Sequence, residues 1–103
     1  MRNTYLVCYD INDDRRLRSV FKIMRDFGDH LQYSVFECQF TQRDLAECRH
    51  LLSEVIDHRE DQVLFVNLGP SERRARKVIT ALGRPYAAVD PPCFVVGNRE
   101  EDS

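Results

Sequence analysis

The fold is decided by Tyr5-Leu6-Val7-Cys8-Tyr9-Asp10-Ile11, a stretch that runs directly into Asn12-Asp13-Asp14-Arg15-Arg16-Leu17-Arg18. Its first five residues are apolar or aromatic, which predicts one strand that is buried on both faces. The run stops at Asp10, so this carboxylate is expected where the strand ends and the chain turns. Asp13 and Asp14 then predict a helix N-cap and an acidic first turn, because negative charge is favourable at the positive end of the helix dipole.

The helix predicted after this turn is strongly basic. Its five basic residues have no acid among them, and they are Arg15, Arg16, Arg18, Lys22 and Arg25. An acid at the carboxyl end of a strand, beside a basic helix, resembles a site for metal and phosphate. In the simpler alternative, Asp10 caps the turn and the arginines form a solvated face. This stretch by itself slightly favours the simpler alternative.

The composition is that of an ordinary soluble globular protein with one domain. The chain has 103 residues and a mass of 12.1 kDa, with 43% hydrophobic and 31% charged residues. Its formal net charge of −2 argues against a protein that binds polyanions over its whole surface. The charges are segregated, however, with basic clusters in residues 15–25 and 73–77 and acidic clusters in residues 54–61 and 100–102. A local basic surface is therefore compatible with the acidic total.

Neither a signal-peptide pattern nor a membrane span is visible in the sequence, since no stretch approaches the roughly twenty apolar residues that cross a bilayer. The cysteines lie in apolar runs or on an apolar helix face, and they are Cys8, Cys38, Cys48 and Cys93. Without a secretion signal they predict buried, reduced thiols and a cytoplasmic location. They form no C-x-x-C pair and no zinc-type spacing with the histidines, so no zinc site is expected.

The periodicity of the apolar residues predicts the remaining elements. The first is a helix that stops at Gly28 and whose apolar face consists of Leu17, Val20, Phe21 and Met24. A strand over residues 30–40, kinked near its middle, comes next. The third element is a helix that starts at the capping box of Thr41 and Asp44. The last three are a buried central strand over residues 63–66 closed by Gly69-Pro70, a short basic helix from Ser71 to Gly83, and a short strand over residues 93–96 that follows a proline-rich arm.

This order predicts an α/β (α+β) sandwich with two helices on one face of a small antiparallel sheet, and ferredoxin-like topology is the best interpretation. The whole chain, residues 1–103, is expected to form a single domain with a C-terminal dimerisation strand and a short acidic tail. Such a sheet has an uncovered face and exposed edges. The strand over residues 93–96 is of the kind that pairs with a partner's edge, so we expect a homodimer.

Several motifs, in this order and spacing, resemble a known family. They are Tyr9-Asp10-Ile11, then Asp14-Arg15-Arg16-Leu17 at the start of the helix, then Gly28, and then Gln32-x-Ser34-Val35-Phe36-Glu37. Together with the length and the element order, they resemble CRISPR-associated protein two, the small nuclease of the spacer-acquisition machinery. The likeness covers nearly the whole chain.

The resemblance implies a function and its partners. Family members are homodimers in which the last strand joins the sheet of the partner, and they act in the prokaryotic cytoplasm. The aspartate at the end of the first strand, here Asp10, is proposed to meet its symmetry mate and hold a divalent cation for phosphodiester cleavage in RNA or double-stranded DNA. Members also bind duplex DNA at the centre of a complex with the CRISPR integrase, a role that does not need the nuclease chemistry in many systems.

We therefore expect a metal-dependent endonuclease with Asp10 as catalytic and metal-binding residue and Mg²⁺ as cofactor, since Mg²⁺ needs only one or two carboxylates beside substrate phosphate. The residues expected to bind nucleic acid are Arg15, Arg16, Arg18, Arg73, Arg74, Arg76 and Lys77. Among the first three, Arg16 and Arg18 are preferred, and Arg15 is equally available. Two alternatives are a non-catalytic DNA-binding scaffold of the integration complex and a ferredoxin-like RNA-binding or regulatory module.

Some nearby residues are kept out of the site. Tyr9 and Phe36 are expected in the core, because alternation along a strand turns Tyr9 away from Asp10. His30, Gln32 and Ser34 are not expected to be catalytic.

Overall fold

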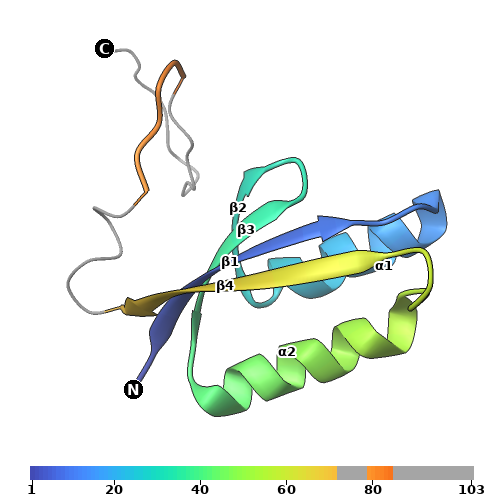
Figure 1. Ribbon diagram of the computed structural model, residues 1–103, viewed down its shortest axis with the longest axis horizontal. Coiled ribbons are helices and arrows are strands. Elements are labelled where there is room, and N and C mark those ends of the chain that lie inside the picture. Colours follow the sequence, from blue (N-terminus) through green and yellow to red (C-terminus); the bar gives the residue numbers. More distant parts are fainter. Residues whose placement is uncertain (72–78, 85–103) are drawn as a thin grey trace.

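The computed structural model describes residues 1–71 and 79–84. These residues form, in chain order, β1 (Asn3–Asp10), α1 (Asp14–Arg25), β2 (Gly28–Gln32), β3 (Val35–Phe40), α2 (Gln42–Val55) and β4 (Gln62–Pro70). The strands make one antiparallel sheet in the order β2-β3-β1-β4, and both helices lie on the same face of it (Figure 1). This arrangement is the ferredoxin-like sandwich that the sequence predicts.

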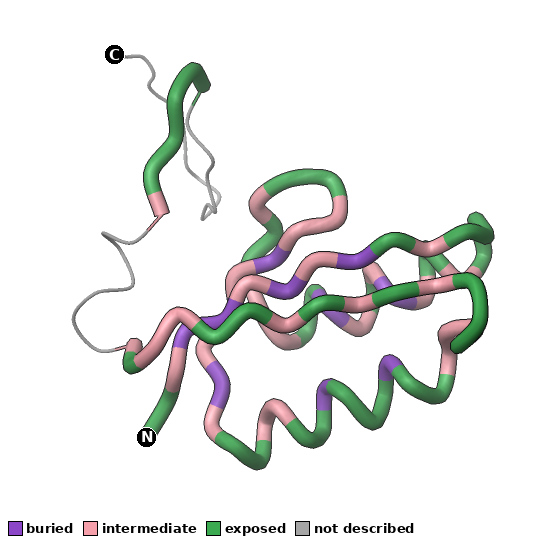
Figure 2. Tube along the Cα trace, in the orientation of Figure 1, coloured by how far each residue is buried: buried purple, intermediate pink, exposed green. Residues whose placement is uncertain are grey.

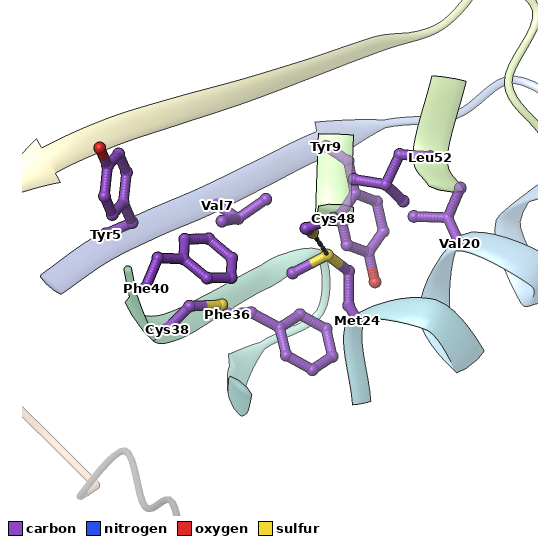
Figure 3. Close-up of a cluster of buried hydrophobic side chains, with 10 residues drawn as sticks. All are labelled: Tyr5, Val7, Tyr9, Val20, Met24, Phe36, Cys38, Phe40, Cys48 and Leu52. Atoms are coloured by element: carbon purple, nitrogen blue, oxygen red, sulfur yellow. Dashed lines mark hydrogen bonds between the residues drawn. The ribbon is translucent and has the colours of Figure 1, made fainter. Parts of the chain in front are cut away.

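The core lies between the sheet and the two helices, because successive side chains of a strand point to opposite faces and only one face is covered by helices. The buried residues are Tyr5, Val7 and Tyr9 from β1, Phe36, Cys38 and Phe40 from β3, Val20 and Met24 from α1, and Cys48 and Leu52 from α2 (Figure 3). Burial raises the pKa of the Cys38 and Cys48 thiols to about 12. Both thiols are free, as predicted, and they stay protonated at neutral pH.

Both helices begin at the caps that the sequence predicts. The Asp13 carboxylate accepts hydrogen bonds from the backbone N–H groups of Arg15 and Arg16, at 3.1 and 3.0 Å. At α2, the Thr41 hydroxyl accepts from the Asp44 N–H at 3.0 Å, and the Asp44 carboxylate accepts from the Thr41 N–H at 3.1 Å. These bonds satisfy donors that the first turn of a helix leaves without intrahelical partners.

The single kinked strand predicted over residues 30–40 is wrong, because the chain reverses at Tyr33 and Ser34 and forms the β2–β3 hairpin. The apolar residues of this stretch change from one side of the predicted strand to the other near its middle, and that change marks the reversal. Gly28 begins β2 and does not end α1, which stops at Arg25. A Cβ atom on Gly28 would overlap the Cys38 sulfur and the Glu37 carbonyl oxygen, so the close approach of β2 to β3 requires glycine here.

The last described strand, β4, pairs only with β1 among the described residues and so lies at an edge of the sheet. It was predicted as a buried central strand, but Leu64 is 50% exposed and Val66 is 42% exposed. Figure 2 shows exposed and half-buried residues along this strand. The prediction that β1 is buried on both faces is also wrong for the single chain, because Leu6 and Cys8 on its second face are only half-buried.

The segment after β4 departs from the prediction where it is described. Residues 79–84 contain bends and no helix, so the predicted basic helix does not reach Gly83, whose φ is +94°. The predicted strand over residues 93–96 and most of that basic segment lie outside the described residues. Among the described helices, none is long and apolar enough to cross a membrane.

Candidate functional site

Asp10 is the last residue of β1, and its side chain is exposed. The preceding residue, Tyr9, points to the opposite face and is only 6% exposed (Figure 3). Its ring stacks on Phe36 with the centroids 6.3 Å apart, and burial raises the pKa of its phenol. The alternation of β1 thus anchors Tyr9 in the core, as predicted, and presents the Asp10 carboxylate to solvent.

The turn that follows Asp10 is held by a buried carboxylate, Asp61. Arg16 donates to it twice, from Nε to Oδ2 at 2.8 Å and from Nη2 to Oδ1 at 3.2 Å. The Asp61 side chain is fully buried and also accepts from the backbone N–H groups of Asn12 at 2.9 Å and Asp57 at 2.8 Å. These bonds, the Arg16 bond foremost, hold the pKa of Asp61 well below its usual range. The β1–α1 turn is therefore tied to the α2–β4 turn.

The three arginines of the β1–α1 region differ in their surroundings. Arg16 uses its guanidinium in the pair with Asp61, lies 3.7 Å from Glu60, and is 26% exposed. Arg15 and Arg18 are exposed, and in the part of the chain that the structure describes their side chains form no salt bridge. Their contact with phosphate stays a prediction. Arg15 and Arg18 have the freer guanidinium groups, whereas sequence reasoning preferred Arg16 and Arg18.

A hollow of about 780 Å³ lies between the end of β1, helix α1 and the β2–β3 turn. Its charged lining consists of one acid, Asp10, and three basic residues, Arg15, Arg18 and Lys22. The rest of the lining is mostly apolar or aromatic and includes Tyr33 at the hairpin turn. Because the basic groups outnumber the acid, the hollow suits an anion that carries both charge and flat apolar surface.

The β2–β3 turn at the rim of this hollow is fixed from two sides. The Tyr9 backbone N–H donates to the Ser34 carbonyl at 3.0 Å, and His30 Nε2 donates to the Tyr33 carbonyl at 2.8 Å. The His30 ring packs against Phe21 and Phe36, with centroid distances of 5.1 and 4.9 Å. His30 thus positions the turn, which gives it a structural role.

A divalent cation fits this site only in part. Within residues 1–71 and 79–84, no group of three or more histidine, cysteine or acidic residues could hold a metal ion. Asp10 supplies one hard carboxylate donor beside basic groups that would hold phosphate. Mg²⁺ accepts such a site when further oxygens come from substrate phosphate, water or a second carboxylate. One chain therefore offers half of a plausible Mg²⁺ site.

Comparison with known proteins decides the family. The family model described as CRISPR associated protein Cas2 matches residues 3–81, which is most of the chain. The chain belongs to the Cas2 family. The resemblance noted from the sequence motifs is thereby confirmed.

Relatives in this family span most of the chain. The CRISPR-associated endoribonuclease Cas2 of Geobacter sulfurreducens is 38% identical over 86 residues, which cover 84% of this chain and 90% of the relative. A protein of the same name from Thermus thermophilus is 40% identical over 77 residues, which cover 74% of this chain and 81% of the relative.

Solved structures share the fold, and one of them is a Cas2 protein. The structure of Streptococcus pyogenes Cas2 at pH 6.5 is 34% identical, has a TM-score of 0.68, and the match covers 78% of this chain and 99% of that one. A hypothetical protein from Thermus thermophilus gives a TM-score of 0.72 at 26% identity, covering 82% of this chain and 95% of that one. These matches confirm the ferredoxin-like fold of the Cas2 family for this chain.

The sequence analysis predicted only some of the residues that the structure places at this end of the sheet. It selected Asp10, Arg15 and Arg18, and the structure finds all three around one hollow. It missed Asp61, because nothing in the acidic turn distinguishes this acid from its neighbours. It also missed Tyr33, which falls within the strand predicted over residues 30–40 and in fact lies at the hairpin turn. The second basic group lies outside the described residues, namely Arg73, Arg74, Arg76 and Lys77.

Proposed function

We propose that this Cas2-family protein is a CRISPR adaptation protein that binds nucleic acid as a homodimer and cleaves phosphodiester bonds at Asp10, as a metal-dependent endonuclease. The observation that carries the proposal is the exposed Asp10 carboxylate at a hollow lined by three basic side chains. The endoribonuclease names of the relatives support the same reaction class.

Each residue of the site has a distinct task in this proposal. Arg15, Arg18 and Lys22 bind the phosphates of the substrate strand, because exposed basic groups on one helix face pair well with a polyanion. Arg16 works through Asp61 as a positioning residue, since their ion pair holds the turn that follows Asp10. Asp10 holds Mg²⁺, which when bound would activate water and offset charge on the phosphate.

A second copy of the chain completes the site in this proposal. A single Asp10 is a weak Mg²⁺ ligand set, and the Asp10 of a partner subunit would supply the second carboxylate. The sheet face opposite the helices carries Leu64 and Val66, which are exposed apolar side chains of an edge strand. An uncovered apolar face beside a free strand edge favours burial against another copy. The predicted strand over residues 93–96 would extend this interface.

The Asp10→Asn variant tests the nuclease. It keeps the shape of the side chain and removes the charge that binds the cation, and both copies change at once in a homodimer. We expect Mg²⁺-dependent cleavage of RNA or double-stranded DNA to be lost, while folding and nucleic-acid binding remain. Cleavage that persists in purified Asp10→Asn protein would assign the activity to another site or to a contaminant.

A second candidate function is a non-catalytic scaffold that binds duplex DNA between copies of the CRISPR integrase. The basic lining of the hollow favours it, because such binding needs the arginines and not the carboxylate. Spacer acquisition in cells that carry Asp10→Asn separates the two roles. We expect acquisition to be retained, and its loss in a folded, dimeric variant would show that the chemistry is needed.

A further inference from the structure

Tyr33 is an aromatic side chain that the fold holds out in solvent. It is 92% exposed, although tyrosine rings usually bury much of their surface. The backbone beneath it is not free, because His30 bonds the Tyr33 carbonyl and Tyr9 bonds the Ser34 carbonyl. The fold therefore fixes the backbone of Tyr33, while its ring is not covered by any of the described residues.

The ring stands at a charged hollow. Tyr33 lines the same hollow as Asp10, Arg15, Arg18 and Lys22. The hairpin that carries it lies beside β1, whose end bears Asp10 (Figure 1). An aromatic face next to phosphate-binding cations is the combination by which proteins hold single-stranded nucleic acid, since every base has a flat face to stack. A base inside a continuous duplex has both faces covered by its neighbours and cannot be stacked in this way.

We propose that Tyr33 stacks on an unpaired base next to a phosphate bound by Arg15 and Arg18, and so makes the site selective for strands that are single or locally unpaired. This rests on the proposed function, because it assumes that the hollow binds nucleic acid. The charge of the lining favours a nucleic-acid strand over a protein partner, with three basic groups against one acid. Burial of Tyr33 against a second copy of the chain is the competing occupant.

Two substitutions separate stacking from packing. Tyr33→Phe keeps the ring, and Tyr33→Leu keeps an apolar side chain but removes the π face. Neither touches the bonds that hold the turn, because those bonds use the backbone carbonyls of Tyr33 and Ser34. The probes are a fluorescein-labelled single-stranded RNA of mixed sequence and a blunt duplex of the same sequence. Affinity is measured by fluorescence anisotropy with EDTA present, so that no Mg²⁺-dependent cleavage occurs.

We expect Tyr33→Leu to weaken binding of the single strand by roughly ten-fold or more, as the loss of base stacking does elsewhere, and Tyr33→Phe to bind like the wild type. Duplex affinity should be the same for all three proteins. Equal single-strand affinity for Tyr33→Leu and wild type overturns the proposal. The proposal is also overturned if Tyr33→Leu lowers the affinity for both probes equally and changes the mass of the protein in light scattering, because Tyr33 then belongs to a subunit interface.

The outcomes also separate this inference from the proposed nuclease. A wild-type protein that binds neither probe overturns both. A wild-type protein that binds the single strand through Tyr33 but still cleaves after Asp10→Asn supports the stacking role and overturns the nuclease assignment at Asp10.

Discussion

Asp61 connects the turn that follows Asp10 to the turn that precedes β4. Its buried carboxylate accepts hydrogen bonds from the Arg16 side chain and from the Asn12 and Asp57 backbone, which joins two turns at one end of the sheet. The Arg16 hydrogen bond, more than any other, lowers the pKa of Asp61. A group whose pKa falls on folding stabilises the folded state above its unfolded-chain pKa, about 4 for aspartate. That stabilisation disappears as the pH falls through the folded-state pKa.

The Asp61→Asn variant should therefore be less stable than the wild type near neutral pH. On acidification, its stability should fall by less than that of the wild type. The amide cannot form an ion pair with Arg16, so its stability has no acid-labile part from this position. Thermal unfolding followed by circular dichroism, from neutral pH down to below about pH 4, measures both effects. Asp29→Asn, which changes an exposed carboxylate on β2, serves as the matched control. If the stability of Asp61→Asn and of the wild type fell equally on acidification, this role of Asp61 would be contradicted.

Among the elements, α2 begins with a complete capping box. Thr41 and Asp44 bond each other reciprocally at its first turn, and the bond from the Thr41 backbone N–H to the Asp44 carboxylate is the main cause that lowers the pKa of Asp44. The same helix supplies Cys48 and Leu52 to the core, so its first turn sets where these side chains enter. The cap thus connects a four-residue motif to the packing of the whole helical face.

Thr41→Ala removes the hydroxyl that accepts from the Asp44 N–H, and we expect it to destabilise the protein by about 1 kcal/mol. Thr41→Ser keeps the hydroxyl and should stay close to the wild type. Urea unfolding of the three proteins gives the comparison, with unchanged m-values as the check that only stability has changed. A Thr41→Ser protein as unstable as Thr41→Ala would mean that the methyl group, and not the cap, carries the effect.

For the whole molecule, the uncovered sheet face predicts self-association. Light scattering on the purified chain should give about twice 12.1 kDa, as a homodimer requires. Leu64→Glu together with Val66→Glu should shift the mass toward the monomer, because charge on an exposed apolar edge strand opposes burial against a second copy. Truncation before Pro91 should also weaken the dimer if the last strand takes part. A wild-type monomer at micromolar concentration would contradict the interface.

The charge distribution predicts that nucleic-acid binding depends on local groups and on salt. Although the net charge is −2, Arg15 and Arg18 lie together at the hollow. Affinity for duplex DNA should fall steeply as salt rises, through release of counterions. Replacing Arg15 or Arg18 by Ala should lower the slope of log K against log salt by about 1 for each phosphate that is no longer neutralised. Arg43→Ala, on the exposed side of α2, should leave the slope unchanged.

The second basic group needs its own variant in the same titration. Duplex binding that is unaffected when Arg73, Arg74, Arg76 and Lys77 are all replaced by Ala would make that group a solvated face.

The sequence by itself determined the parts of this protein that depend on neighbours within a few residues. The cap at Asp13, the capping box at Thr41, the apolar stripe of α1 and the position of Asp10 at a strand end all follow from local hydrogen bonds and periodicity. The ferredoxin-like class followed from the order of these elements, and the motifs around Asp10 pointed to the family.

Only the tertiary structure decided which distant residues meet. Arg16 pairs with Asp61 across 45 positions of sequence, so no local pattern could separate it from Arg15 and Arg18. The reversal at Tyr33 makes a hairpin of one predicted strand and places an aromatic ring at the rim of the hollow. Among the described strands, β4 lies at an edge because of pairing order, which hydrophobicity does not encode. In each case the deciding energy comes from contacts that exist only once the chain has folded.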